Sequence, residues 1–149
     1  MLAIGTRAPE FTLPDADGVP QSLTRLLEAG SLVLYFYPAD FTPGCTREAC
    51  ELRDLNTQLV AARLRVVGIS PQDPATHARF RERYALPFTL LADVDKQVIR
   101  AYDVDGPLGF GVRRGTYLIG SDGVIADAVL ADFRIGRHTE FVRHALAAR

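Results

Sequence analysis

The stretch that decides the fold of this chain reads Tyr35-Phe36-Tyr37-Pro38-Ala39-Asp40-Phe41-Thr42-Pro43-Gly44-Cys45-Thr46-Arg47-Glu48-Ala49-Cys50, and it holds both cysteines. The apolar run Leu32–Tyr37 is rich in β-branched and aromatic residues, so it predicts a buried strand. Pro38, Pro43 and Gly44 then interrupt the pattern, and from Pro43 onward the apolar spacing is typical of a helix. The sequence therefore predicts a strand, a turn and a helix in immediate succession.

The start of this helix has features that favour a reactive thiol. Thr42 is a good N-cap residue, and Pro43 suits the first helical position because its missing N–H would be unpaired there anyway. Cys45 then lies in the first turn, where unpaired N–H groups and the positive end of the helix dipole favour an anion. A lone cysteine in a helix is usually a small buried apolar residue, but this setting favours the nucleophilic thiolate.

The two cysteines are spaced as a redox pair that needs a change of conformation. Five residues along a regular helix put their Cα atoms roughly 8–9 Å apart. A disulfide requires Cα atoms within about 7 Å of each other. We therefore expect that Cys45 and Cys50 can form a bond only after the first turns of the helix unwind.

This stretch resembles the active-site segment of the peroxiredoxins, thiol peroxidases in which Pro-x-x-x-Thr-x-x-Cys surrounds the cysteine that attacks the peroxide. The matching residues are Pro38, Thr42 and Cys45. A second cysteine five residues later resembles the PrxQ subfamily, also called bacterioferritin comigratory protein. The resemblance covers essentially the whole chain and implies an α/β, thioredoxin-like fold. This fold has a central mixed sheet with helices on both faces and an N-terminal β-hairpin.

The resemblance also implies a role for each residue of the motif. Cys45 would be the nucleophile that attacks the peroxide and becomes a sulfenic acid. Thr42 would accept the peroxide proton and orient the O–O bond, while Pro38 would keep water away from the sulfur. Cys50 would resolve the sulfenic acid as an intramolecular disulfide; the alternative is that Cys50 only packs and an external thiol does this work.

A second segment, Arg114-Gly115-Thr116-Tyr117-Leu118-Ile119, resembles the Arg-x-Ser/Thr-Phe segment whose arginine lies beside the catalytic cysteine in that family. A guanidinium there would favour the thiolate and bind the charge that develops in the transition state. Arg113 is a competing candidate, but the register to Thr116 favours Arg114. Glu48, one turn after Cys45, either bridges to Arg114 or lies on the surface, and the sequence leaves both readings open.

The other elements are predicted from apolar periodicity and turn residues. They are a hairpin of Ala8–Leu13 and Val19–Leu23, a short helix Ser22–Ala29, the helix from Pro43 to about Ala62, a strand Leu64–Ser70, a helix from Asp73-Pro74, a strand Pro87–Leu91, a helix Asp95–Tyr102, a hairpin of Arg114–Ile119 and Val124–Val129, and a helix from about Thr139. The glycine-rich segment Asp105–Gly111 predicts a mobile connection or a wall of the active site. A phosphate loop is disfavoured because no Lys-Ser/Thr and no helix follow it.

Composition narrows the classes of protein further. The chain has 149 residues, which predicts one domain over 1–149, and its net charge of −1 gives no basis for binding nucleic acid or an anionic membrane. The longest apolar run is too short to span a bilayer, and the N-terminus lacks the pattern of a signal peptide, so we expect a cytoplasmic protein. Two cysteines and three scattered histidines (His77, His138 and His144) match no zinc pattern, and no metal or other cofactor is expected.

These patterns and the resemblance together predict a thiol peroxidase that reduces hydrogen peroxide and organic hydroperoxides through a Cys45–Cys50 disulfide. The resemblance implies thioredoxin or a similar dithiol protein as reductant, and a monomer. Two alternatives stay open: a redox-sensing binding protein that uses the same disulfide, and a one-cysteine peroxidase. A dithiol–disulfide oxidoreductase fits poorly, because Cys45-Thr46-Arg47-Glu48 lacks the second cysteine of a Cys-x-x-Cys motif.

Overall fold

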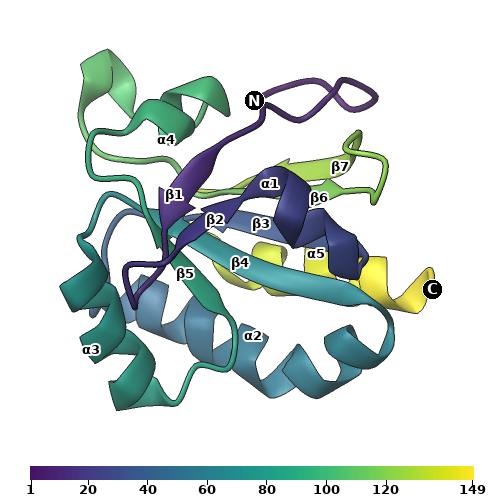
Figure 1. Ribbon diagram of the computed structural model, residues 1–149, viewed down its shortest axis with the longest axis horizontal. Helices are drawn as coiled ribbons and strands as arrows, with labels where there is room; N and C mark the ends of the chain where they lie inside the picture. The colour runs from purple at the N-terminus through teal and green to yellow at the C-terminus, as the bar shows by residue number, and fades with distance from the viewer.

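The computed structural model describes residues 1–149 and is built around one five-stranded mixed sheet (Figure 1). Its strands, in the spatial order β5-β4-β3-β6-β7, are β5 (Thr89–Ala92), β4 (Leu64–Ser70), β3 (Ser31–Phe36), β6 (Gly115–Ile119) and β7 (Ile125–Leu130). The strands β3, β4 and β5 run parallel, whereas β6 pairs antiparallel with β3 and β7 pairs antiparallel with β6. A separate two-stranded hairpin is formed by β1 (Thr12–Pro14) and β2 (Pro20–Ser22).

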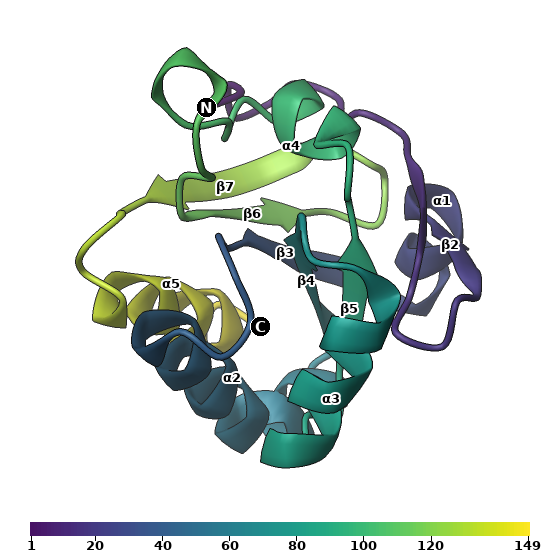
Figure 2. The ribbon, with the colours of Figure 1, turned by 90° about the vertical axis from the view of Figure 1, so that its left-hand side faces the viewer.

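Helices cover both faces of the sheet, which confirms the predicted fold class (Figure 2). They are α1 (Leu23–Leu26, continued by the 3-10 turn η1, Leu27–Ala29), α2 (Pro43–Ala61), α3 (Pro74–Tyr84), α4 (Gln97–Ala101), the 3-10 turn η2 (Pro107–Gly109) and α5 (Gly136–Ala147). The apolar side chains of α1 and α4 pack in one core, and those of α2, α3 and α5 pack in the core on the opposite face. None of the helices combines the length and the apolar character that a membrane crossing requires.

The central strand β3 is buried on both faces because its side chains alternate between the two cores. Leu32, Leu34 and Phe36 belong to the core beneath α1 and α4. Val33 and Tyr35, with Tyr37 just after the strand, belong to the core beneath α2, α3 and α5. A strand covered on both sides needs apolar residues at every position, which is why the run Leu32–Tyr37 shows no polar alternation.

The register of the sheet brings the two predicted active-site segments together. Phe36, the last residue of β3, pairs with Ile69 in β4 on one side and with Gly115, the first residue of β6, on the other. Because β6 is antiparallel to β3, the residue before Gly115 lies at the same edge of the sheet as the chain that leaves Phe36. Arg114 therefore lies close to the loop and helix that follow β3.

Several element boundaries differ from the prediction. The first strand is shorter than predicted, because Ala8 donates its N–H to Gly123 in the β6–β7 turn and not to the hairpin partner. The last helix begins at Gly136, three residues before Thr139, and its start is built by short-range bonds from His138 N–H to Ile135 O and from Arg137 N–H to Arg134 O. No side chain caps this helix start, so the sequence carries no signal for it.

A substitution in β4 tests the packing of the central strand. Gly68 lies directly opposite Tyr35, and a Cβ atom at Gly68 would lie 2.7 Å from Tyr35 Cζ. Since the tyrosine ring is buried and cannot move aside freely, we expect Gly68→Ala to lower the free energy of unfolding by about 1–3 kcal/mol. Urea unfolding measures this change.

Gly136→Ala is the matched control. The nearest atom to a Cβ at Gly136 lies at 3.5 Å, an ordinary contact, and the position is helical. We expect no loss of stability there, because alanine is a better helix former than glycine. Equal destabilisation by the two substitutions would contradict the packing argument.

Candidate active site

The loop between β3 and α2 places Cys45 in the first turn of α2. Thr42 occupies the N-cap position with extended backbone angles, and Pro43 is the first helical residue. The predicted N-cap residue is confirmed, but its side chain does not bond to the helix: Thr42 Oγ1 donates its proton to Ala39 O at 3.1 Å. A hydroxyl that donates in this way keeps its lone pairs free to accept another proton.

Cys45, Arg114 and Glu48 form a buried cluster. Arg114 Nη2 donates to Cys45 Sγ at 3.0 Å, and Arg114 Nη1 donates to Glu48 Oε1 at 3.2 Å. The cysteine and the glutamate are each only 1% exposed and Arg114 is 7% exposed, so these interactions are shielded from water. The sulfur of Cys45 therefore lies against a buried guanidinium group.

Arg113, the competing candidate, lies elsewhere. Its Nε and Nη2 donate to Asp132 Oδ2 at 3.2 Å and 2.9 Å on the surface of the protein. The other oxygen of Asp132 accepts the backbone N–H of Arg114 at 3.0 Å. Asp132 thus holds Arg113 outward, and the structure places Arg114 against the sulfur.

Glu48 is the bridging residue and not a surface residue, which decides between the two readings that the sequence left open. Burial raises the pKa of its carboxyl to about 8, and the nearby guanidinium of Arg114 lowers the pKa by less than burial raises it. Its second oxygen, Oε2, has no hydrogen-bond partner, and His138 Nδ1 lies 3.8 Å away. A carboxyl in this position holds a proton near neutral pH, in the same buried cluster as the sulfur of Cys45.

His138, from α5, is a part of this region that sequence reasoning missed. Its Nε2 faces Ala131 O at 2.9 Å and therefore carries a proton. Burial lowers the pKa of the imidazole, so the ring is neutral and its Nδ1 accepts from Thr116 Oγ1 at 2.8 Å. These bonds fix the start of α5 against β6, and no local sequence signal marks such a long-range contact.

Gly44 makes room for the guanidinium, although the sequence indicated it only as a turn residue. A Cβ atom there would lie 3.0 Å from Arg114 Nη2 and 2.6 Å from Ile135 Cδ1. A side chain at this position would therefore require Ile135 and the guanidinium to shift.

Cys50 lies on the same helix as Cys45, and both cysteines are free thiols. The helix α2 is continuous from Pro43 to Ala61, so the two residues keep the helical separation that prevents a disulfide. Cys50 is partly exposed while Cys45 is buried. A bond between the two sulfurs requires the segment that joins them to unwind.

A cavity of about 800 Å³ is lined in part by Arg114 of this cluster. Pro38, the glycine-rich segment with Phe110 and the β7–α5 loop with Phe133 also line it. The segment Asp105–Gly111 is thus a wall of the site, one of its two predicted roles. No three His, Cys, Asp or Glu side chains gather where they could hold a metal ion.

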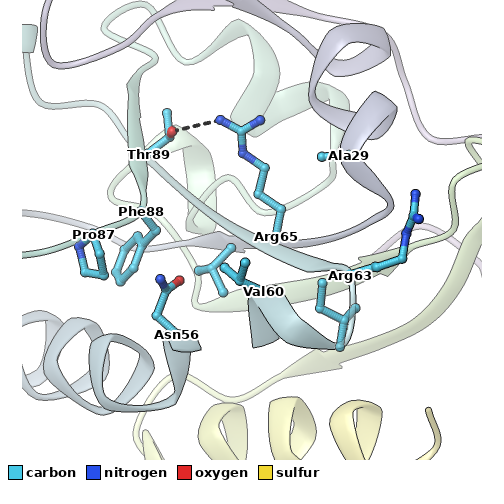
Figure 3. Close-up of a pocket in the computed structure, with 10 residues that line it drawn as sticks. Ala29, Asn56, Val60, Arg63, Arg65, Pro87, Phe88 and Thr89 are labelled. Carbon is cyan, nitrogen blue, oxygen red and sulfur yellow. Dashed lines mark hydrogen bonds between the residues drawn. The ribbon is translucent and has the colours of Figure 1, made fainter. Parts of the chain in front are cut away.

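A second cavity, of about 240 Å³, lies at the opposite end of the sheet (Figure 3). It is lined by residues at the start of β4 and by residues just before and at the start of β5, with Arg65 reaching toward Thr89 Oγ1 at 3.4 Å. The start of β4 pairs with Ser31 at the start of β3, whereas Cys45 follows the end of β3. This cavity is therefore separate from the candidate site.

Comparison with known proteins assigns the family. The family model described as AhpC/TSA family matches residues 4–128. The chain belongs to the AhpC/TSA family. The peroxiredoxin bcp of Coxiella burnetii is 42% identical to it over 143 residues, covering 92% of this chain and 93% of the relative. A chloroplastic peroxiredoxin Q of Oryza sativa subsp. japonica is 41% identical over 136 residues, covering 90% of this chain and 62% of the relative.

Solved structures agree with this assignment. The crystal structure of peroxidoxin BcpB from Mycobacterium tuberculosis matches with a TM-score of 0.92 at 36% identity, covering 99% of this chain and 98% of that chain. Peroxiredoxin Q of Xanthomonas campestris matches with a TM-score of 0.85 at 28% identity, covering 93% and 90%. These relatives confirm the predicted PrxQ and bacterioferritin comigratory protein resemblance, and the chain is a peroxiredoxin, hence a peroxidase.

The buried carboxyl of Glu48 makes the stability of this peroxiredoxin depend on pH. Its pKa of about 8 in the folded protein lies above its ordinary value of 4.5, so between these values the folded protein holds a proton that the unfolded chain has lost. The free energy of unfolding should therefore fall as the pH rises through this window, by at most about 1.4 kcal/mol per pH unit from this group. Urea unfolding of the reduced protein at a series of pH values measures the slope.

Glu48→Gln serves as the comparison, because glutamine keeps the shape of the side chain and does not titrate. The difference in unfolding free energy between the two proteins should change with pH only between about 4.5 and 8. Parallel pH profiles for both proteins would show that Glu48 is ionised in the folded protein throughout this range.

Proposed function

We propose that this peroxiredoxin reduces hydrogen peroxide and organic hydroperoxides by a two-cysteine mechanism within one chain. The Cys45 thiolate attacks the terminal peroxide oxygen, the O–O bond breaks, and the leaving oxygen takes a proton and departs as water or alcohol. The sulfur, oxidised by two electrons, becomes a sulfenic acid. The Cys50 thiol then attacks this sulfur, the S–O bond breaks, water leaves and a disulfide forms.

The contact between Arg114 and Cys45 is the observation that carries this proposal. The guanidinium donates to the sulfur at 3.0 Å, and both groups are buried. There it favours the thiolate before reaction, and it also stabilises the negative charge that moves to the peroxide oxygens as their bond breaks. Glu48 accepts from the other nitrogen of the same guanidinium and so orients it.

Thr42 and Pro38 are assigned supporting roles. The Thr42 hydroxyl donates to Ala39 O, so its lone pairs can accept the proton of the hydroperoxide and direct the O–O bond toward the sulfur. Pro38 lines the cavity, and its proposed role is to limit the access of water. Neither residue supplies electrons to the reaction.

The experiment that tests the mechanism compares the wild-type protein with Cys45→Ser and Cys50→Ser. We expect peroxide consumption with a thioredoxin system to be lost in Cys45→Ser, because serine is a far weaker nucleophile at neutral pH. Mass spectrometry of the oxidised wild-type protein should show a Cys45–Cys50 disulfide, and Cys50→Ser should stop at the sulfenic acid.

The outcomes separate the alternatives. Turnover by Cys45→Ser would show that the nucleophile is another group. Full turnover by Cys50→Ser would make the protein a one-cysteine peroxidase. A wild-type protein that oxidises once and then does not turn over with any dithiol reductant would favour the redox-sensing binding protein.

The cavity beside Arg114 supports organic hydroperoxides as substrates. Its volume of about 800 Å³ is much larger than hydrogen peroxide needs, and its walls carry two exposed aromatic side chains, Phe110 (78% exposed) and Phe133 (97% exposed). Exposed aromatic rings beside a cavity offer apolar surface to an alkyl or aryl group. A solved structure of the Xanthomonas campestris relative is described in terms of its alkyl peroxide reduction activity.

Replacing these rings should therefore change the preference among peroxides. We expect Phe110→Ser and Phe133→Ser each to lower kcat/KM for cumene hydroperoxide by about 3- to 10-fold, since each removes part of the apolar wall. The same constant for hydrogen peroxide should stay near the wild-type value. Val94→Ser, which removes an apolar side chain of similar exposure outside this cavity, is the control; equal losses for both peroxides would contradict the assignment.

We further propose that thioredoxin or a similar dithiol protein reduces the disulfide, and that the protein acts as a monomer in the cytoplasm. Two free thiols suit a reducing compartment, where a disulfide forms only as a step of catalysis. The net charge of −1 offers no electrostatic attraction to nucleic acid or to an anionic membrane. No cofactor enters the proposed mechanism, because the sulfur itself carries the two electrons.

A further inference from the structure

A buried ion pair outside the Cys45 cluster holds the loop that leads into α2. Asp40 lies between Pro38 and Thr42, and its side chain is fully buried. Its Oδ2 lies 2.6 Å from His77 Nδ1, and its Oδ1 accepts from Tyr37 Oη at 2.6 Å. His77 comes from α3, and its side chain is also fully buried.

His77 has a hydrogen-bond partner at each of its ring nitrogens. Its Nε2 lies 3.0 Å from Leu91 O in β5, and a carbonyl oxygen can only accept a hydrogen bond. Its Nδ1 faces a carboxylate, which also only accepts when ionised. His77 therefore joins Asp40 to β5 through hydrogen bonds at both of its ring nitrogens, in a pair that is closed to water.

The next residue, Phe41, gives a second and independent sign that α3 holds this loop. Its backbone has φ of +66°, a left-handed conformation that residues other than glycine adopt at a cost in energy. Its ring packs edge-on against Phe80 of α3, with centroids 5.2 Å apart, and near Tyr84 of the same helix. Such a conformation persists when the surroundings fix the residues on both sides of it.

We propose that His77 is a positioning residue for the peroxidase reaction, which holds the Pro38–Thr42 loop through Asp40 and so sets the start of α2 relative to Arg114. This inference rests on the proposed function. The ion pair fixes the loop at Asp40, and the turn at Phe41 then directs Thr42 and the first turn of α2 toward the arginine. His77 touches neither the sulfur nor the peroxide and acts only through the backbone that it holds.

This role predicts different effects on the two steps of the reaction. Attack on the peroxide needs Cys45, Thr42 and Arg114 at the correct distances and angles from one another. A displacement of about 1 Å among such groups can lower a rate by roughly 100-fold. Disulfide formation needs the first turns of α2 to open, so a loosened loop does not slow this step. A residue that only stabilised the fold would not single out the first of these steps.

The experiment is a single-turnover rapid-quench measurement on His77→Gln, Asp40→Asn and the double variant. Mass spectrometry of the quenched samples follows the dithiol, the sulfenic acid and the disulfide after mixing with hydrogen peroxide. We expect each single variant to lower the rate constant of the peroxide step by about 10- to 100-fold without slowing disulfide formation. The double variant should lose no more than the worse single variant, because both substitutions break one pair.

Two further variants keep the test decisive. Tyr37→Phe removes one hydrogen bond to Asp40 and leaves the ion pair and the packing, so it should fold and show a smaller loss in the same step. Leu59→Ala destabilises the distant, C-terminal half of α2 and should keep the wild-type rate of the peroxide step.

The outcomes separate the positioning role from the proposed function. The role of His77 would be overturned if Tyr37→Phe and every ion-pair variant that folds kept the wild-type rate of the peroxide step. It would also be overturned if Leu59→Ala slowed this step as much as the ion-pair variants do. Wild-type protein that consumes no peroxide would contradict the proposed function and the positioning role together. Turnover by the wild type with unaffected variants would contradict the positioning role alone.

Discussion

The hydrogen bond from Arg114 to the sulfur of Cys45 is the interaction on which the rest of this structure depends. A guanidinium taken out of water is unfavourable unless its hydrogen bonds and its charge find partners. Here one nitrogen donates to the sulfur and another donates to Glu48. The antiparallel pairing of β6 with β3 brings Arg114 to this point, and the missing side chain of Gly44 lets it approach. This one contact therefore depends on the topology of the sheet, on the start of α2 and on the charge of the guanidinium.

The same contact links the chemistry to the conformational step of the proposed mechanism. In the reduced protein, the guanidinium and the intact first turn of α2 both favour a thiolate at Cys45. Once the sulfur becomes a sulfenic acid and holds its proton, it carries no negative charge, and this part of the attraction to Arg114 is lost. The first turn then opens at a lower cost after oxidation than before it. Oxidation itself thus favours the approach of Cys45 to Cys50, with no need for a ligand or a second protein.

The elements with strong local patterns and the residues within one motif could be predicted from the sequence. The apolar run of β3, the Thr-Pro-Gly start of α2 and the spacing of Arg114 from Thr116 are local features, and the structure has each element where they predict it. The direction of the Thr42 hydroxyl was not predictable, because a cap and a bond to Ala39 O differ only in a side-chain rotation. His77 and His138 were considered only as possible metal ligands. Their actual partners, Asp40 and Thr116, lie 37 and 22 residues away in the sequence, and no periodic pattern marks such pairs.

The supports on either side of Cys45 define how much of the chain can move in the proposed cycle. On one side, Asp40 is held by His77 and Tyr37, and the Phe41 ring packs against α3. On the other side, Leu52 is the first of the leucines of α2, followed by Leu55 and Leu59, that bury against the sheet. Unwinding beyond Leu52 would expose these apolar side chains to water, which costs about 25 cal/mol of free energy for each Å² of apolar surface. Unwinding between Thr42 and Leu52 leaves all three leucines in the core. Both cysteines lie inside this interval, so the segment that must open for the disulfide is the one whose opening leaves this leucine core intact.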